Sequence, residues 1–159
     1  MNKQKLILKV IEHLSSELEL YIRAAKAAHA EATHEQSKAE NKYDTRGLEA
    51  SYLARGQSKQ AAETEKAIEE FQLLSPKSFG PDDPIDLGAV VELANQHDTS
   101  HYLLAPRGGG TDVFHEKREI LVITPQSPLG SQLVGKKQGD RLMIQIAGSR
   151  NEHTVISVC

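Results

Sequence analysis

The chain has 159 residues and a formal net charge of −3 at neutral pH, enough for one medium domain or two small ones. This charge argues against a surface that binds nucleic acid by bulk electrostatic attraction. The single cysteine, Cys159, rules out an intrachain disulfide and fits a reducing cytosol, so we expect a cytoplasmic protein. Lys9 and Glu12 interrupt the first apolar run, which argues against a signal peptide or a membrane span.

The N-terminal half carries two series of apolar or small residues whose spacing alternates between four and three. The first series is Ile7, Ile11, Leu14, Leu18, Tyr21, Ala25, Ala28 and Ala32. The second and weaker series is Tyr43, Gly47, Ala50, Ala54, Gln57, Ala61, Thr64, Ile68 and Phe71. This alternation is typical of a coiled-coil seam. Two seams of similar length, without a proline between residues 2 and 75, predict an antiparallel helical hairpin over residues 1–75.

The bulky ends of the two seams predict the register of this hairpin. If Ile7 faces Phe71 and Ile11 faces Ile68, the chain folds back near Lys38-Ala39-Glu40. The seam residues become smaller toward this point, from Ile, Leu and Phe to Ala and Gly. Small seam residues let helices approach closely but bury little apolar area, at about 25 cal/mol per Å². We therefore expect a thin outer hairpin that is weakly held together.

The C-terminal half is predicted to be an α+β domain over residues 85–159, joined to the hairpin by a proline-containing linker at 76–84. Strand-like stretches lie at residues 89–93, 101–104, 119–124, 141–146 and 153–158, and a short apolar helix at 129–134. Ser127 and Pro128 precede this helix, and they suit an N-cap and a first helical position. The glycine-rich run at 107–111 lacks the Gly-Lys-Ser/Thr ending of a phosphate-binding loop.

The order of elements from Ile120 onward resembles the C-terminal domain of the Gre-type (GreA/GreB) transcript cleavage factors. A strand leads to Ser127-Pro128 and the apolar helix, and the turn Gly135-Lys136-Lys137-Gln138-Gly139-Asp140 then leads to a strand. This resemblance implies an FKBP-like antiparallel sheet with one short helix. It implies that Gln126, Ser127 and Pro128 dock on a coiled coil at the rim of the RNA polymerase secondary channel.

The resemblance also implies what the hairpin does. In this family a monomeric factor without a stand-alone active site inserts its hairpin into the secondary channel, close to the 3′ end of the nascent RNA. Two acidic residues, three apart and followed by Asn, sit at the hairpin tip and help hold a second Mg²⁺ for hydrolysis of backtracked RNA. Arg55 resembles a basic position that contacts this RNA.

The tip of this chain departs from that pattern. Glu40-Asn41 matches the second acid and its Asn, but Ser37 occupies the position of the first acid. An alignment from the second helix instead places the two positions that are acidic in the family at Asp44 and Gly47. The two alignments differ by about seven residues, so this tip is longer than usual. We rank Glu40, then Asp44, then Glu35 as the catalytic candidates. Glu40 and Asp44 are the candidate ligands for a Mg²⁺ shared with the polymerase, and they would share a helical face if both lay in one helix.

The sequence is compatible with three functions. The factor stimulates cleavage of backtracked RNA, or it occupies the channel without cleavage and antagonises cleavage factors. A third reading is an FKBP-like peptide-binding or prolyl isomerase module on a dimerising coiled coil. The tip acids also have a plain explanation as solvated charges at helix ends, offset by Lys38, Lys42 and Arg46.

Overall fold

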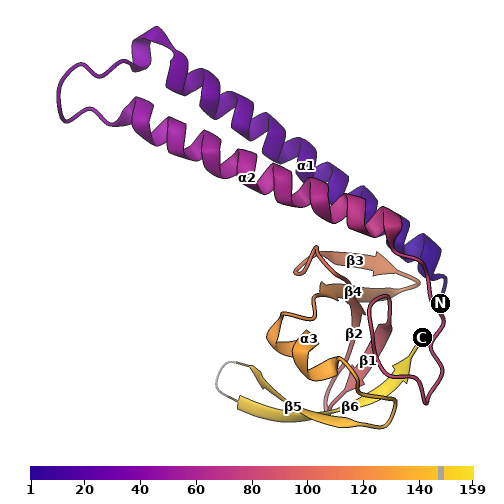
Figure 1. Cartoon of the computed structure of the whole chain (residues 1–159). Coiled ribbons are helices and arrows are strands. Elements are labelled where there is room, and N and C mark those ends of the chain that lie inside the picture. The colour runs from indigo at the N-terminus through magenta and orange to yellow at the C-terminus, as the bar shows by residue number, and fades with distance from the viewer. Residues whose placement is uncertain (147–148) are drawn as a thin grey trace. The chain divides into compact units, whose positions relative to one another are not determined.

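The computed structural model describes residues 1–146 and 149–159, and its fold is α+β as predicted (Figure 1). Two long helices come first, and a six-stranded mixed sheet with one short helix follows. The helical elements are α1 (Lys3–Thr33), the 3₁₀ turn η1 (Glu35–Ser37), α2 (Arg46–Leu73) and α3 (Pro128–Leu133). The strands are β1 (Val90–Ala94), β2 (Thr99–Leu104), β3 (Asp112–His115), β4 (Arg118–Ile123), β5 (Arg141–Ile146) and β6 (Ser149–Val158). Neither long helix has the sustained apolar length that crossing a membrane requires, within the described chain.

The chain divides into two compact units. One comprises Leu14–Ile68, the outer part of the helical hairpin, and the other comprises Met1–His13 together with Glu69–Cys159. Within the second unit, Lys9 Nζ donates to the carbonyl of Phe114 at 2.8 Å, and Arg107 Nε lies 2.7 Å from Glu70 Oε1. The ends of the two helices therefore group with the sheet. The domain boundaries inferred from the sequence, a hairpin at 1–75 and an α+β domain at 85–159, remain predictions.

The helical hairpin follows the predicted seams closely. Every predicted seam position from Ile7 to Ala32 and from Gly47 to Phe71 is buried or half-buried. Tyr43 is the exception, because α2 begins only at Arg46 and the Tyr43 side chain is 80% exposed. Thr33 and Arg46 bracket a loop centred between Ala39 and Glu40, which confirms the predicted fold-back point. At about 1.5 Å per residue, α1 is roughly 45 Å long.

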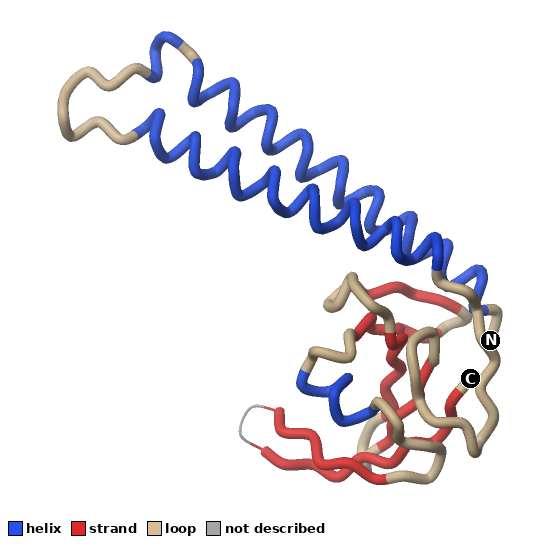
Figure 2. The backbone as a smooth tube through the Cα atoms, in the orientation of Figure 1, coloured by secondary structure: helices blue, strands red, loops and turns tan. Residues whose placement is uncertain are grey.

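The sheet has the strand order β3-β4-β2-β1-β6-β5, and α3 lies over one face of it (Figure 2). The main core includes Leu133 of α3 and therefore lies on this face. Alternate residues of the central strands point to this face, as the two-residue period of a strand requires. The core cluster contains Ile85, Ala89, Val91, Leu93, Leu104, Ile123, Leu133, Leu142, Ile144, Val155 and Val158. Aliphatic side chains dominate this core, as expected for a chain without tryptophan.

Two features of the sheet were not expected from the sequence: an additional strand, and one parallel pair of strands. Strand β3 was not predicted, although it pairs with β4 across a turn at Glu116 and Lys117. Both turn residues have positive φ angles, of 48° and 63°, without the Gly or Asn that usually signals such a turn. In addition, β2 and β4 are parallel, because the chain inserts the loop at 105–111 and strand β3 before it returns alongside β2.

Helix α3 packs tightly against the end of β4. Ser127 Oγ accepts a hydrogen bond from the backbone N–H of Gly130 at 3.0 Å and donates one to the carbonyl of Thr124 at 2.7 Å. Pro128 occupies the first turn, where a backbone N–H would lack a helical partner. A Cβ atom at Gly130 would overlap the carbonyl oxygen of Thr124. Only glycine therefore allows this helix to lie so close to the strand that precedes it.

Candidate functional site: the hairpin tip and the Ser-Pro loop

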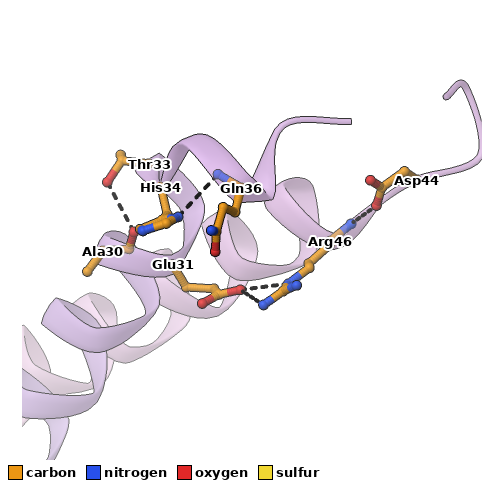
Figure 3. A network of polar contacts seen from close by, with 7 residues as sticks. All are labelled: Ala30, Glu31, Thr33, His34, Gln36, Asp44 and Arg46. Carbon is orange, nitrogen blue, oxygen red and sulfur yellow. Dashed lines mark hydrogen bonds and ion pairs between the residues drawn. The ribbon is translucent and has the colours of Figure 1, made fainter. Parts of the chain in front are cut away.

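The hairpin tip is a loop, not a continuation of either helix. At the end of α1, the Thr33 hydroxyl donates back to the carbonyls of His29, at 2.9 Å, and Ala30, at 3.3 Å, and the second of these carbonyls lies in the last helical turn. His34 Nδ1 then accepts a hydrogen bond from the backbone N–H of Gln36 at 3.1 Å and caps the turn η1 (Figure 3). The chain continues through an exposed segment to α2, which begins at Arg46.

An ion pair closes the mouth of this loop. Arg46, the first residue of α2, reaches Glu31 on α1, with its Nε at 2.7 Å and its Nη2 at 2.6 Å from Glu31 Oε1 (Figure 3). Both side chains are exposed, so the pair itself contributes little stability. The pair shows that the two helix ends lie side by side where the loop begins. This pair was not predicted from the sequence, although the predicted register places Glu31 and Arg46 nearly opposite each other.

Asp44 organises the second half of the loop. Its Oδ1 accepts the backbone N–H of Arg46 at 3.2 Å, and its Oδ2 accepts that of Glu40 at 3.2 Å. These two hydrogen bonds, that of Arg46 first, lower the pKa of the Asp44 carboxyl below its ordinary value. Glu40 and Asp44 would share a helical face only if both lay in one helix, and neither lies in a helix. Asp44 instead caps the start of α2 and ties the backbone of Glu40 to it.

Glu40 and Glu35 are the free carboxylates of the tip. Both side chains are exposed, and neither accepts a hydrogen bond or forms an ion pair with any described residue. Glu40 is held through its backbone by Asp44, whereas Glu35 lies in η1. Among the described residues no group of three or more His, Cys, Asp or Glu side chains could hold a metal ion. A metal at this tip would therefore need further ligands from a partner.

Arg55 lies on the exposed side of α2, away from the tip loop. It lines an open groove between the two helices, with Lys26 and His29 of α1 and several small residues. The other lining residues are Ala25, Ala30, Ser51, Ala54 and Ser58. Because no acidic side chain lines this groove, its charged groups are all basic. This clustering across two helices could be found only once the register of the hairpin was known.

The predicted docking residues form one exposed corner at the start of α3. Gln126 and Pro128 are exposed, whereas Ser127 is half-buried and uses its hydroxyl within the cap described above. Ser127 therefore shapes this corner, and the side chains of Gln126 and Pro128 are those presented to solvent.

Several solved structures are similar to this chain. The crystal structure of GreA factor homolog 1 (Gfh1) of Thermus thermophilus is 21% identical, with a TM-score of 0.39 and 94% of each chain covered. Gfh1 of Thermus aquaticus is 22% identical, with a TM-score of 0.40 and 92% of each chain covered. The prokaryotic transcription elongation factor GreA/GreB from Nitrosomonas europaea is 18% identical, with a TM-score of 0.39, covering 60% of this chain and 78% of that one. No protein-family model and no curated protein match the sequence.

Taken together, the geometry separates three kinds of acidic residue at the tip. Glu40 and Glu35 are free acids, Asp44 is a loop-organising acid, and Glu31 is paired with Arg46. The tip can thus offer the carboxylates of Glu40 and Glu35 as oxygen ligands. It cannot form a complete metal centre from its described residues.

Proposed function

We propose that this chain is a Gre-type factor that acts on bacterial RNA polymerase in the cytoplasm. The observation that carries this proposal is the hairpin: two helices packed through small residues such as Ala28 and Ala50, ending in a loop that displays free carboxylates. A thin probe of this kind suits insertion into a narrow channel. An acidic tip suits a site where Mg²⁺ and RNA phosphates meet, because Mg²⁺ prefers oxygen ligands.

In this proposal the factor stimulates hydrolysis of backtracked RNA by the polymerase. The polymerase would supply the nucleolytic centre and the first metal, and Glu40 would help hold a second Mg²⁺, with Glu35 as the other free acid of the tip. Asp44 acts as a positioning residue, because its hydrogen bond to the Glu40 backbone N–H sets where Glu40 lies. The Mg²⁺ would activate water and neutralise charge on the phosphate.

The other predicted contacts have separate roles. Gln126 and Pro128 meet the coiled coil at the rim of the secondary channel, on a corner shaped by Ser127. Arg55, in the basic groove between the helices, contacts the phosphates of the RNA.

A second candidate function is a channel-occupying regulator that does not stimulate cleavage and antagonises factors that do. The engagement of Asp44 with two backbone N–H groups favours this alternative, because it leaves fewer free carboxylates at the tip than the sequence suggested. One carboxylate anchors a shared metal less firmly than two.

A transcript cleavage assay on a stalled, backtracked polymerase complex with Mg²⁺ separates these functions. We expect wild type to release short 3′ RNA fragments and Glu40→Ala to lose this activity by about a hundredfold, as expected for removal of a metal-positioning group. Polymerase binding, measured in parallel, should be equal for both proteins. Glu65→Ala, which removes an exposed carboxylate from α2 away from the tip, serves as the matched control.

Each other outcome also has a meaning. Unchanged cleavage by Glu40→Ala would remove Glu40 from the metal site. Binding by wild type without cleavage, together with inhibition of an added cleavage factor, would establish the channel-occupying regulator. Absence of binding would return the chain to the class of peptide-binding or isomerase modules.

A further inference from the structure

The tip carries one large aromatic side chain that nothing in the loop covers. Tyr43 is 80% exposed and lies between Glu40 and the start of α2. Isolated exposed apolar residues are common on protein surfaces, so exposure alone carries no function. A binding role for Tyr43 requires surroundings that match one particular ligand.

The backbone beneath this ring is fixed on both sides. The N–H of Tyr43 donates to Asn41 Oδ1 at 2.9 Å, and the N–H of Asp44 donates to the carbonyl of Asn41 at 3.1 Å. Asp44 in turn holds the N–H groups of Glu40 and Arg46. The ring is thus displayed from a loop closed by four hydrogen bonds, which lowers the entropy cost of binding a ligand on it.

A cation accompanies the ring. Lys42 Nζ lies 5.0 Å from the centroid of the Tyr43 ring, within the range of a cation–π contact. No described carboxylate pairs with Lys42. One short segment therefore presents a flat aromatic face, a free cation and, at Glu40, a free carboxylate.

This combination matches a nucleotide better than it matches a protein surface. Buried centres of protein–protein interfaces are depleted of charge, whereas Tyr43 follows Lys38, Glu40 and Lys42 and precedes Asp44 in one short exposed segment. A nucleotide offers a base that stacks on an aromatic face and a phosphate that attracts an ammonium group. Its metal-bound phosphate would also approach Glu40.

We propose that Tyr43 stacks on a nucleobase inside the polymerase, with Lys42 on the adjoining phosphate. This inference rests on the proposed function, because the channel is where the tip would meet a nucleotide. Two sources present the same chemistry: the base at the 3′ end of the RNA and a free nucleoside triphosphate.

Photochemical label transfer from a thio-substituted base tests this, with full-length factor and polymerase and with Ca²⁺ in place of Mg²⁺ to prevent cleavage. In one arm the labelled base is the 3′ base of a backtracked RNA. In the other it belongs to a free, non-complementary nucleoside triphosphate added to an unbacktracked complex.

The variants are Tyr43→Leu, which removes the aromatic face, and Tyr43→Phe, which keeps it. Tyr52→Leu is the matched control, since Tyr52 is a 65% exposed tyrosine on α2.

One arm contains the nucleotide that Tyr43 contacts. In that arm the concentration of the Tyr43→Leu factor that gives half-maximal label transfer should be roughly fivefold to a hundredfold higher than that of wild type, the loss expected for one base stack. Tyr43→Phe and Tyr52→Leu should match wild type. Equal transfer by Tyr43→Leu and wild type in both arms would overturn the inference, as would equal losses in Tyr43→Leu and Tyr43→Phe. Polymerase binding is measured for every variant. Failure of wild type to bind would overturn the proposed function itself, and this inference with it.

Discussion

At the scale of single residues, two glycines in helices show how the surroundings decide what a side chain does. A Cβ atom at Gly130 would overlap the carbonyl of Thr124, whereas a Cβ atom at Gly56 in α2 would meet nothing within 4 Å. We expect Gly130→Ala to lower the free energy of unfolding by about 3 kcal/mol, through forced backbone shifts. Gly56→Ala should raise it by about 0.5–1 kcal/mol, because alanine loses less entropy in a helix. Urea denaturation followed by circular dichroism measures both.

These two substitutions serve as controls for each other. They add the same methyl group, so a general effect of alanine would move both proteins in the same direction. A Gly130→Ala protein as stable as wild type would contradict the close packing of α3 against Thr124.

Asp44 gives the tip a predicted dependence on acidity. Its folded-state pKa is lowered by the N–H groups of Arg46 and Glu40, so its capping contribution is complete above the ordinary carboxyl pKa. That contribution is lost as the pH falls through the lowered pKa, which lies below the ordinary carboxyl pKa of 3.8. Side-chain NMR titration should show this value, and the amide signals of Glu40 and Arg46 should shift with it.

Asp44→Asn supplies the control for this titration. Its amide cannot ionise, so the signals of residues 40 and 46 should lose their acid-dependent shift. A wild-type Asp44 that titrates at or above the ordinary value would show that the two backbone hydrogen bonds do not form in solution.

At the scale of elements, the hairpin is predicted to have a gradient of local stability. Leu14 and Phe71 are large and nearly fully buried, whereas Ala28 and Ala50 bury little area in the outer seam. Hydrogen exchange should therefore be at least about tenfold faster for backbone amides near Ala28 and Ala50 than near Leu14 and Phe71, corresponding to ~1.4 kcal/mol. Equal protection along the hairpin would contradict this gradient.

The elements also show where sequence reasoning failed. Strand β3 escaped prediction because its turn uses Glu116 and Lys117, which carry no usual turn signal. The end of helix α2 nearest the tip was predicted too early, because Tyr43 continues the seam spacing. Asp44 instead starts the helix by accepting the N–H of Arg46, and spacing alone cannot reveal such a cap.

At the scale of the whole molecule, the hairpin has no need of a second copy to bury its seam. Leu14, Ala28, Ala50 and Phe71 are buried within one chain. We therefore expect a monomer of 17.5 kDa at micromolar concentrations, measured by light scattering after size exclusion. Twice this mass would favour the dimerising coiled coil considered from the sequence, and would count against the proposed insertion into a channel.

The sequence by itself determined the helical hairpin, its register and the class of the C-terminal domain. Apolar spacing encodes these directly, since a helix or strand must bury one face. It also identified Glu40 as the leading tip acid, a role that stays a prediction. The tertiary structure decided which acids of the tip are free. That depends on hydrogen bonds and ion pairs between residues brought together by the loop, such as Asp44 with Glu40 and Glu31 with Arg46, and no periodic pattern records them.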